Sequence, residues 1–388
     1  MDQGEVIENR RILMKNDLPI STEDILDHMS EGVCACDRDR RIVYWSKSSE
    51  RITGWQPQDV LGRACHENIL CHEDKDGHRL CGKEYCPLHR TMITGVTSTT
   101  PVIVFARAKD GHRIPMQVTT APLYNAAGEV IGGIETFRDV SPMLADLERA
   151  KRIQSQSMEH KLPDDPRLQF ATFYMPHDIV GGDFYAVEAL DPDRYGFFLA
   201  DMEGHGVAAA LYTIHIGMLW ERHYRLLENP ARFAATINKE LVSVFGEITT
   251  FAAATCGVID ARSATLRFAG AGGPAPLIMD INGNPKKFKS KGITLGVMED
   301  IPDAAAYHEQ TVPLAPGDAI LIFSDGAFEI HNANDELLGL DGFINILTDL
   351  NYPRKPLKMN ALELALLKFS NDIRLQDDIT IIEARYSG

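Results

Sequence analysis

The chain has 388 residues, which is long for a single hydrophobic core and suits two domains with a connector. Hydrophobic residues make up 44% and charged residues 24%, a composition typical of a soluble globular protein. Because 55 acidic residues face 39 Lys and Arg, the net charge is −16, which argues against nucleic acid or anionic lipid as a partner.

The sequence offers no membrane or export signal. No apolar run approaches the roughly 20 residues that a membrane-spanning helix needs. The first 20 residues lack an apolar core behind a basic start, so we expect no signal peptide. A cytoplasmic protein with no membrane contact is the expectation.

After a leader over residues 1–20, residues 21–140 read as one α+β domain. Near-alternating β-branched residues predict three strands, over Thr99–Ala106, Arg113–Pro122 and Val130–Phe137. Short turns rich in Asp, Ala and Gly separate these runs, which favours an antiparallel sheet.

A helical linker is predicted over residues 141–163. Ser141 can cap it, Pro142 suits its first turn, and Pro163 helps to end it. A 4-3-4 spacing indicates the seam of a short coiled coil, formed by Met143, Leu147, Ala150, Gln154 and Ser157 or Met158. Polar residues weaken that seam, so two interpretations stay open: a dimer contact, or a helix that packs on its own domain.

Residues 164–388 read as one α/β domain. Apolar runs predict buried strands at Tyr195–Ala200, Ala252–Ile259 and Ala319–Phe323. Helical patterns lie between and after them, at Val207–Trp220, Pro230–Phe245 and Ala361–Phe369.

Four segments of this domain place an aspartate at the edge of a strand or turn, beside small or acidic residues: Val180–Tyr185, Leu199–Gly206, Phe323–Gly326 and Gln376–Thr380. An unpaired carboxylate at a buried strand end costs several kcal/mol, so several such acids together imply a bound cation. Oxygen ligands without paired His or Cys favour Mg²⁺ or Mn²⁺. Two such ions can activate a shared water for attack on a phosphoryl group.

Taken together, these segments resemble the PPM (PP2C) phosphatases of the SpoIIE/RsbU-like branch, over about residues 165–386. The matching motifs occur in the expected order, at Val180–Tyr185, Ala200–Leu211, Phe251–Thr255, Ala269–Pro276, Leu314–Glu329 and Asp377–Thr380. The resemblance implies a PPM (PP2C-like) α/β/β/α sandwich with two Mn²⁺ or Mg²⁺ ions.

By this resemblance, Asp183 and Asp201 are the catalytic pair and hold the metals, with Asp201 bridging. Further metal ligands would be the backbone carbonyl of Met202 and the carboxylates of Asp325 and Asp377, while Asp378 supports the site. For His205, capping of the next helix is favoured over a role as general acid.

Two positions depart from the branch. Ala186 stands where a second aspartate is usual, and Gly273 replaces the usual histidine of an AGHPP-like turn. Neither departure removes a predicted metal ligand, so we still expect activity. They leave metal affinity and substrate preference open.

Two functions other than a phosphatase fit parts of this pattern. Gly181-Gly182-Asp183 is faintly similar to the GGDEF signature of nucleotide cyclases, but Phe184 stands where that family has an acid. A non-catalytic binder built on this fold is the other alternative, and it would have no need of all four aspartates.

The N-terminal domain resembles a PAS domain over residues 22–140. The matching segments are Asp24–Val33, Arg41–Gly54, Lys109–Pro115 and Gly128–Val140, followed by the common exit Asp139-Val140-Ser141. PAS motifs identify the fold and leave the ligand open.

Six of the seven cysteines lie between Cys34 and Cys86. Candidate sensor ligands are Cys71, His72, Cys81 and Cys86. Thiolates and imidazoles can bind zinc, haem or an iron–sulfur cluster, or the cysteines can act as a redox pair. Simple packing of free cysteines is the competing interpretation.

The sequence therefore predicts a PAS sensor, a coiled-coil linker and a metal-dependent phosphatase in series. The signal would reach the metal ligands through the linker and the helix after Gly206. The resemblance implies a phosphoserine or phosphothreonine substrate on a STAS-type anti-sigma-factor antagonist. A homodimer through the PAS domain and linker is also expected.

Overall fold

The structure is a computed structural model. It describes residues 21–67, 69–74, 77–81, 86–98, 102–158, 161–204, 206–245, 250–297, 307–371 and 376–388. The predicted leader and His205 lie outside these residues. The chain divides into two compact units, Met1–Ala145 and Asp146–Gly388. The narrower limits predicted for leader, sensor, linker and phosphatase domain stay a prediction.

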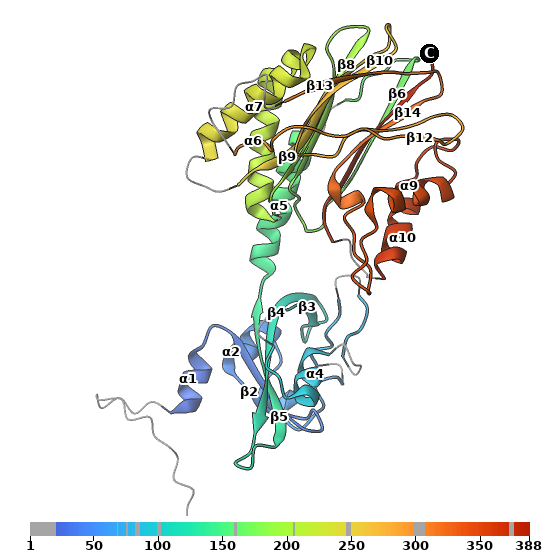
Figure 1. Cartoon of the computed structure of the whole chain (residues 1–388). Coiled ribbons are helices and arrows are strands. Elements are labelled where there is room, and N and C mark those ends of the chain that lie inside the picture. Colours follow the sequence, from blue (N-terminus) through green and yellow to red (C-terminus); the bar gives the residue numbers. More distant parts are fainter. Residues whose placement is uncertain are drawn as a thin grey trace, which may run out of the picture. The chain divides into compact units, whose positions relative to one another are not determined.

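The first unit is a five-stranded antiparallel sheet with short helices, in the order β2-β1-β5-β4-β3 (Figure 1). Its strands are β1 (Gly32–Asp37), β2 (Ile42–Trp45), β3 (Val102–Arg107), β4 (Arg113–Tyr124) and β5 (Val130–Asp139). Its helices are α1 (Thr22–His28), α2 (Lys47–Thr53), α3 (Pro57–Val60) and α4 (Pro87–Thr94).

The alternation seen in the sequence places one face of this sheet in the core. Along β4, Ile114, Met116 and Val118 are buried and alternate with more exposed residues. They pack in one cluster with Trp45 and Phe137. The predicted antiparallel α+β fold is confirmed. Strand β3 is Val102–Arg107, and residues 99–101 of the predicted strand lie outside the described residues.

Helix α5 (Ser141–Met158) follows β5 and contains the boundary between the two units. The backbone N–H of Ser141 donates to the side chain of Asp139 at 2.8 Å. The first N–H groups of a helix have no partner within the helix. The Asp139 carboxylate therefore satisfies one of them at the start of α5.

The second unit has two five-stranded antiparallel sheets, ordered β13-β10-β9-β8-β7 and β12-β11-β14-β15-β6. The first sheet comprises β7 (Asp183–Ala189), β8 (Arg194–Met202), β9 (Ala252–Asp260), β10 (Thr265–Ala271) and β13 (Glu309–Pro313). The second comprises β6 (Leu168–Met175), β11 (Leu277–Met279), β12 (Pro285–Lys286), β14 (Ala319–Phe323) and β15 (Ile379–Tyr386).

Helices cover the outer face of each sheet (Figure 1). Helices α6 (Val207–His223) and α7 (Pro230–Phe245), with the 3₁₀ turn η1 (Tyr224–Glu228), pack on the first sheet through Trp220 and Phe233. Helices α9 (Gly339–Asp349) and α10 (Met359–Ser370) pack on the second through Phe343 and Leu366.

A third cluster fills the space between the two sheets and includes Phe197, Leu199, Ile320 and Ile382. Strands such as β14 are buried on both faces, which explains their unbroken apolar sequence. The predicted α/β/β/α sandwich is therefore confirmed. Within the described residues, no helix has both the length and the apolar character needed to cross a bilayer.

Candidate active site

The site begins with two aspartates on neighbouring strands. Strand β7 starts at Asp183, and the antiparallel register places Asp183 directly opposite Asp201 of β8. Asp183 is fully buried, and Asp201 is partly exposed. Paired residues of this kind have Cβ atoms about 4.5–5.5 Å apart, so two carboxylates share one small region of the sheet edge.

Asp325 and Asp377 belong to the second sheet. Asp325 opens the 3₁₀ turn η2 (Asp325–Ala327) just after β14, and Asp377 stands two residues before β15. The two turns touch, since a Cβ on Gly326 would lie 2.1 Å from the carbonyl oxygen of Asp378. Glycine at position 326 therefore allows the turns that carry Asp325 and Asp377 to come together.

Hydrogen bonds join the strand ends of the two sheets. The Thr380 hydroxyl on β15 donates to Oδ2 of Asp183 on β7. The Asp378 carboxylate accepts the backbone N–H groups of Gly182 and of His177, the latter at 2.6 Å. The acidic segments that are far apart in the sequence therefore meet at one edge of the sandwich.

These acids lie close to one another; within the described ranges no lysine or arginine forms an ion pair with them, while the imidazole of His177 lies near Asp377 and Asp378. Burial, together with the charge of Asp378, raises the pKa of Asp183 well above its ordinary value. Burial also raises the pKa of Asp201, with Asp183 and Asp325 adding to the effect. Burial and Asp325 raise the pKa of Asp377 as well. Each shift reports a carboxylate that is costly to ionise unless positive charge is brought to it.

The donor chemistry fits a hard divalent ion. Oδ1 of Asp183 and Oδ1 of Asp325 are buried without a hydrogen-bond partner, which is unusual for carboxylate oxygens. The Met202 carbonyl, one residue after Asp201, faces Gly182, since a Cβ on Gly182 would lie 3.2 Å from its oxygen. Within the described ranges, no three His, Cys, Asp or Glu side chains are placed to hold one ion jointly. The roles of the individual ligands therefore stay a prediction.

Gln154 of α5 is a residue whose role at the site the sequence did not predict. Its side chain is buried, and its Nε2 donates to the Gly181 carbonyl at 2.6 Å and to the Thr213 hydroxyl at 2.8 Å. The N–H of Gly181 in turn donates to Oε1 of Gln154 at 3.3 Å. Gln154 thus connects α5 with α6 and with the glycine pair that precedes Asp183.

This contact changes the interpretation of the linker seam. Gln154 and Met158 are both buried inside the second unit, and Met158 belongs to the cluster under α6 and α7. The C-terminal end of α5 therefore packs on its own domain, while Met143 at the other end is 49% exposed. The polar side chain that weakens a coiled-coil seam is here a structural hydrogen-bonding group.

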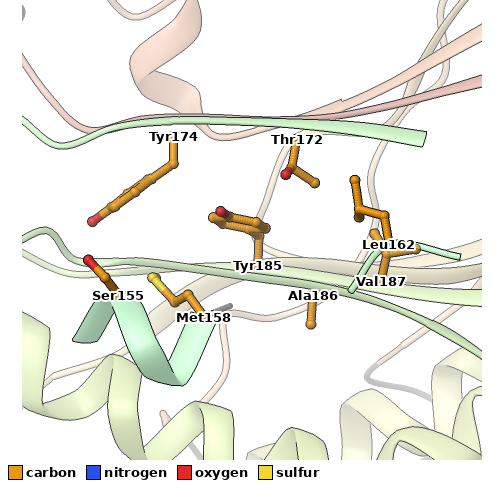
Figure 2. A pocket seen from close by; sticks show the side chains of 8 residues that line it. All are labelled: Ser155, Met158, Leu162, Thr172, Tyr174, Tyr185, Ala186 and Val187. Carbon is orange, nitrogen blue, oxygen red and sulfur yellow. The ribbon is translucent and has the colours of Figure 1, made fainter. Parts of the chain in front are cut away.

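Next to this contact lies a cavity of about 300 Å³ between β6, β7 and the end of α5 (Figure 2). Tyr174 and Thr172 line it from β6, and Tyr185 lines it from β7. The Tyr174 hydroxyl lies so close to Gly181 that a Cβ there would be 2.1 Å from it. The wall of the cavity is thus continuous with the backbone that leads to Asp183.

The structure gives physical reasons for the two family departures. Ala186 is buried on β7 in the hydrophobic cluster that packs under α6 and α7, so a carboxylate there would enter an apolar core. Gly273 lies against β9, and a Cβ on it would be within 2.7–3.0 Å of three backbone atoms of Ala254. A histidine at position 273 would not fit without a shift of that strand.

The candidate sensor residues of the first unit are all buried. His72, Cys81 and Cys86 line one small cavity, whereas Cys71 does not. Three further polar or sulfur-containing residues line the same cavity and were not among the candidates: Cys34, Cys65 and Glu135. Glu135 stands on β5, far from the cysteine-rich segment, so its spacing carried no signal.

Comparisons with known proteins agree with this geometry. The family described as Stage II sporulation protein E (SpoIIE) matches residues 191–387, just over half of the chain. The chain belongs to the SpoIIE family. A PAS fold matches residues 26–142, and metal ions are expected of the SpoIIE half.

Two curated relatives come from Bacillus subtilis (strain 168). Phosphoserine phosphatase RsbU is 22% identical over 310 residues, covering 79% of this chain and 88% of RsbU. Phosphoserine phosphatase RsbP is 24% identical over 187 residues, covering 47% of this chain. The aligned part spans 45% of RsbP, and that of a third relative, protein IcfG of Synechocystis, spans 41%.

Among solved structures, the SiaA-PP2C domain of Pseudomonas aeruginosa is similar, with a TM-score of 0.53 and 25% identity. The match covers 63% of this chain and 97% of that domain. The second unit of this SpoIIE-family chain therefore has a PP2C-type fold.

Proposed function

We propose that this SpoIIE-family chain is a metal-dependent phosphoprotein phosphatase that removes phosphate from serine or threonine. The observation that carries the proposal is the convergence of Asp183, Asp201, Asp325 and Asp377 at one edge of the sandwich. The pKa values of Asp183, Asp201 and Asp377 are raised, and Asp183 and Asp325 each have a buried oxygen that lacks a partner. The names of RsbU and RsbP as phosphoserine phosphatases support the same reaction.

Two Mn²⁺ or Mg²⁺ ions are part of the proposal, held by these four carboxylates and the Met202 carbonyl. When bound, the ions would supply an activated water and neutralise charge on the phosphoryl oxygens. The chain's own contribution is to place the acids. The Thr380 hydroxyl orients Asp183, the Ser324 hydroxyl accepts the backbone N–H of Thr380 and so joins the end of β14 to β15, and Asp378 fixes the backbone at Gly182.

Regulation would run from the PAS unit through α5 to the site. Gln154 supports this route, because its side chain bonds both to Gly181, two residues before Asp183, and to Thr213 on α6. A movement of α5 that broke these bonds would release the backbone next to a predicted metal ligand. The buried Cys and His groups of the first unit are the proposed place of signal detection, by a cofactor or by thiol chemistry.

The proposed substrate is a STAS-type phosphoprotein in a partner-switching pathway. Homodimerisation through the PAS domain and the exposed N-terminal part of α5, and a cytoplasmic location, complete it. A non-catalytic interaction protein is the competing function, and nucleotide cyclisation is a distant third.

Metal titration of the full-length chain tests the proposal. With p-nitrophenyl phosphate as substrate, activity should require Mn²⁺ or Mg²⁺ and vanish with a chelator. Asp183→Asn should lower activity at least about a hundredfold, because it removes a charge from the proposed ligands. The matched control is Asp335→Asn, an exposed acid in the same unit. Wild-type activity in Asp183→Asn, or no hydrolysis with any metal, would reject the proposed site.

A further inference from the structure

The first unit contains a buried group of thiols that the phosphatase reaction does not use. All of its cysteines are free and buried. A cavity of about 10 Å³ lies among them, lined by Cys34, Cys65, Leu70, His72, Cys81, Cys86, Leu88 and Glu135. Four of the eight lining residues are cysteines, whose role can rest on reactivity as well as on packing.

The thiols form two separate hydrogen-bonded sets. The sulfur atoms of Cys34 and Cys36 are 3.9 Å apart, and Cys36 also bonds to Cys65. The Cys81 thiol bonds to the sulfur of Cys86. Cys81 and Cys86 are thus a contacting pair, distinct from the set of Cys34, Cys36 and Cys65.

Cys86 has a different environment from its neighbours. It occupies the N-cap position of α4, where a helix N-terminus favours a thiolate, and it makes no side-chain capping hydrogen bond there; its sulfur bonds to the Cys81 thiol. The Cys81 bond is the main reason that the pKa of Cys86 falls to about 6. The same bond, together with burial, raises the pKa of Cys81. The lowered pKa favours the thiolate, which is the nucleophilic form, at Cys86 rather than at Cys81.

His72 supplies a neutral base at the same cavity. Burial lowers its pKa to about 4, and neither ring nitrogen makes a hydrogen bond. Its Nε2 lies 3.5 Å from Oε1 of Glu135, whose pKa burial raises to about 8, so both groups are uncharged at neutral pH. The backbone N–H of His72 donates to the Cys81 sulfur at 3.1 Å.

The size of the cavity indicates which kind of ligand or reactant these thiols could meet. A volume of about 10 Å³ holds roughly one molecule of the size of water, whereas cavities for organic ligands measure about 300–1,000 Å³. The thiols also satisfy one another in the two sets, and no three of the described Cys, His or acidic groups are placed around one ion. A small oxidant fits this arrangement better than a haem or a metal.

We propose that Cys81 and Cys86 are a site of reversible oxidation by hydrogen peroxide, with a disulfide as the product. The Cys86 sulfur attacks one peroxide oxygen, the O–O bond breaks, and the leaving hydroxide takes up the proton that Cys86 gave up on ionising. Cys86 is then a sulfenic acid. The Cys81 sulfur attacks it, the S–O bond breaks, and the hydroxyl leaves as water with the proton of the Cys81 thiol. Two thiols lose two electrons, and one peroxide becomes two waters.

Thiol mapping of the full-length chain tests this site and needs no phosphatase activity. The reduced protein is treated with one equivalent of hydrogen peroxide, alkylated and digested without reductant for mass spectrometry. We expect two of the seven thiols to be lost and one cross-linked peptide to join Cys81 to Cys86. Dithiothreitol should restore both thiols.

Three variants give matched controls. Cys86→Ser should abolish the loss of both thiols, and Cys81→Ser should stop at a sulfenic acid on Cys86 that dimedone traps. Cys256→Ser, in the second unit, should behave as wild type. A disulfide within the Cys34, Cys36 and Cys65 set, unchanged peroxide reaction in Cys86→Ser, or no reaction of the wild type would overturn the proposal. If a variant fails to fold, the wild-type peptide map still shows whether peroxide joins Cys81 to Cys86.

Discussion

Replacement of Gln154 by leucine tests whether α5 supports the active-site backbone. The change keeps the approximate size of the side chain and removes its amide. It leaves the N–H and carbonyl of Gly181 without their partner and removes one of two bonds of the Thr213 hydroxyl, which also donates to Ala210. All of these groups are buried.

The cost follows from the two orphaned backbone groups. Each buried group left without a hydrogen bond costs about 1–3 kcal/mol, so a loss of about 3 kcal/mol in the free energy of unfolding is expected. For a unit of this size, 1 kcal/mol lowers the melting temperature by about 2–4 °C, which gives a drop of about 6–12 °C. If about 1 kcal/mol of this is felt at Asp183, the metal concentration for half-maximal activity rises about fivefold.

Two measurements check this expectation. Thermal unfolding is followed by calorimetry without metal, and amide hydrogen exchange is followed in the peptide that contains Gly181 and Asp183. The matched control is Gln156→Leu, the same substitution at an exposed position of the same helix. Equal melting temperatures and equal exchange in the two variants would refute a supporting role for Gln154.

Three further predictions concern other groups. Asp201→Asn should abolish metal-dependent hydrolysis and yet raise the melting temperature in chelator at pH 8. Burial and the neighbouring acids raise the pKa of Asp201, so the folded state disfavours the ionised form that the unfolded state adopts at pH 8, and asparagine removes that cost; a lower melting temperature would contradict this reasoning. Gly182→Ala should melt lower and lose activity, because the new Cβ would lie 2.9 Å from the Gly204 carbonyl oxygen; unchanged melting and kinetics would contradict the close contact. Because burial raises the pKa of Glu135 to about 8 from 4.5, the folded state keeps the proton longer than the unfolded state, and stability falls as pH rises from 4.5 to 8. Glu135→Gln should flatten that slope in melting curves, and an unchanged slope would show that Glu135 does not cause it.

The sequence predicted the fold well where local pattern and burial agree. The predicted strand Ala319–Phe323 has the same first and last residues as β14, and the predicted helix Pro230–Phe245 has the same first and last residues as α7. The first is a continuous apolar run and the second an amphipathic one, so each segment can bury its apolar side chains in only one kind of secondary structure.

The site was predictable only in part. The four aspartates carried a signal because each stands beside small residues at a strand edge. Gln154 carried none, since a glutamine on a helix is ordinary and only the fold brings it to Gly181. Glu135 was missed for the same reason: it is one residue in the alternating pattern of β5, and only burial beside His72 sets it apart.

The close packing of Gly273 against Ala254 also bears on how this chain can vary. A side chain at position 273 would displace the β9 backbone, and β9 pairs with β8 beside Asp201. A single substitution there cannot be neutral, so the family histidine would return only together with compensating changes in β9. Random libraries that vary position 273 alone should keep glycine. A change from this glycine to histidine should need a second substitution in β9.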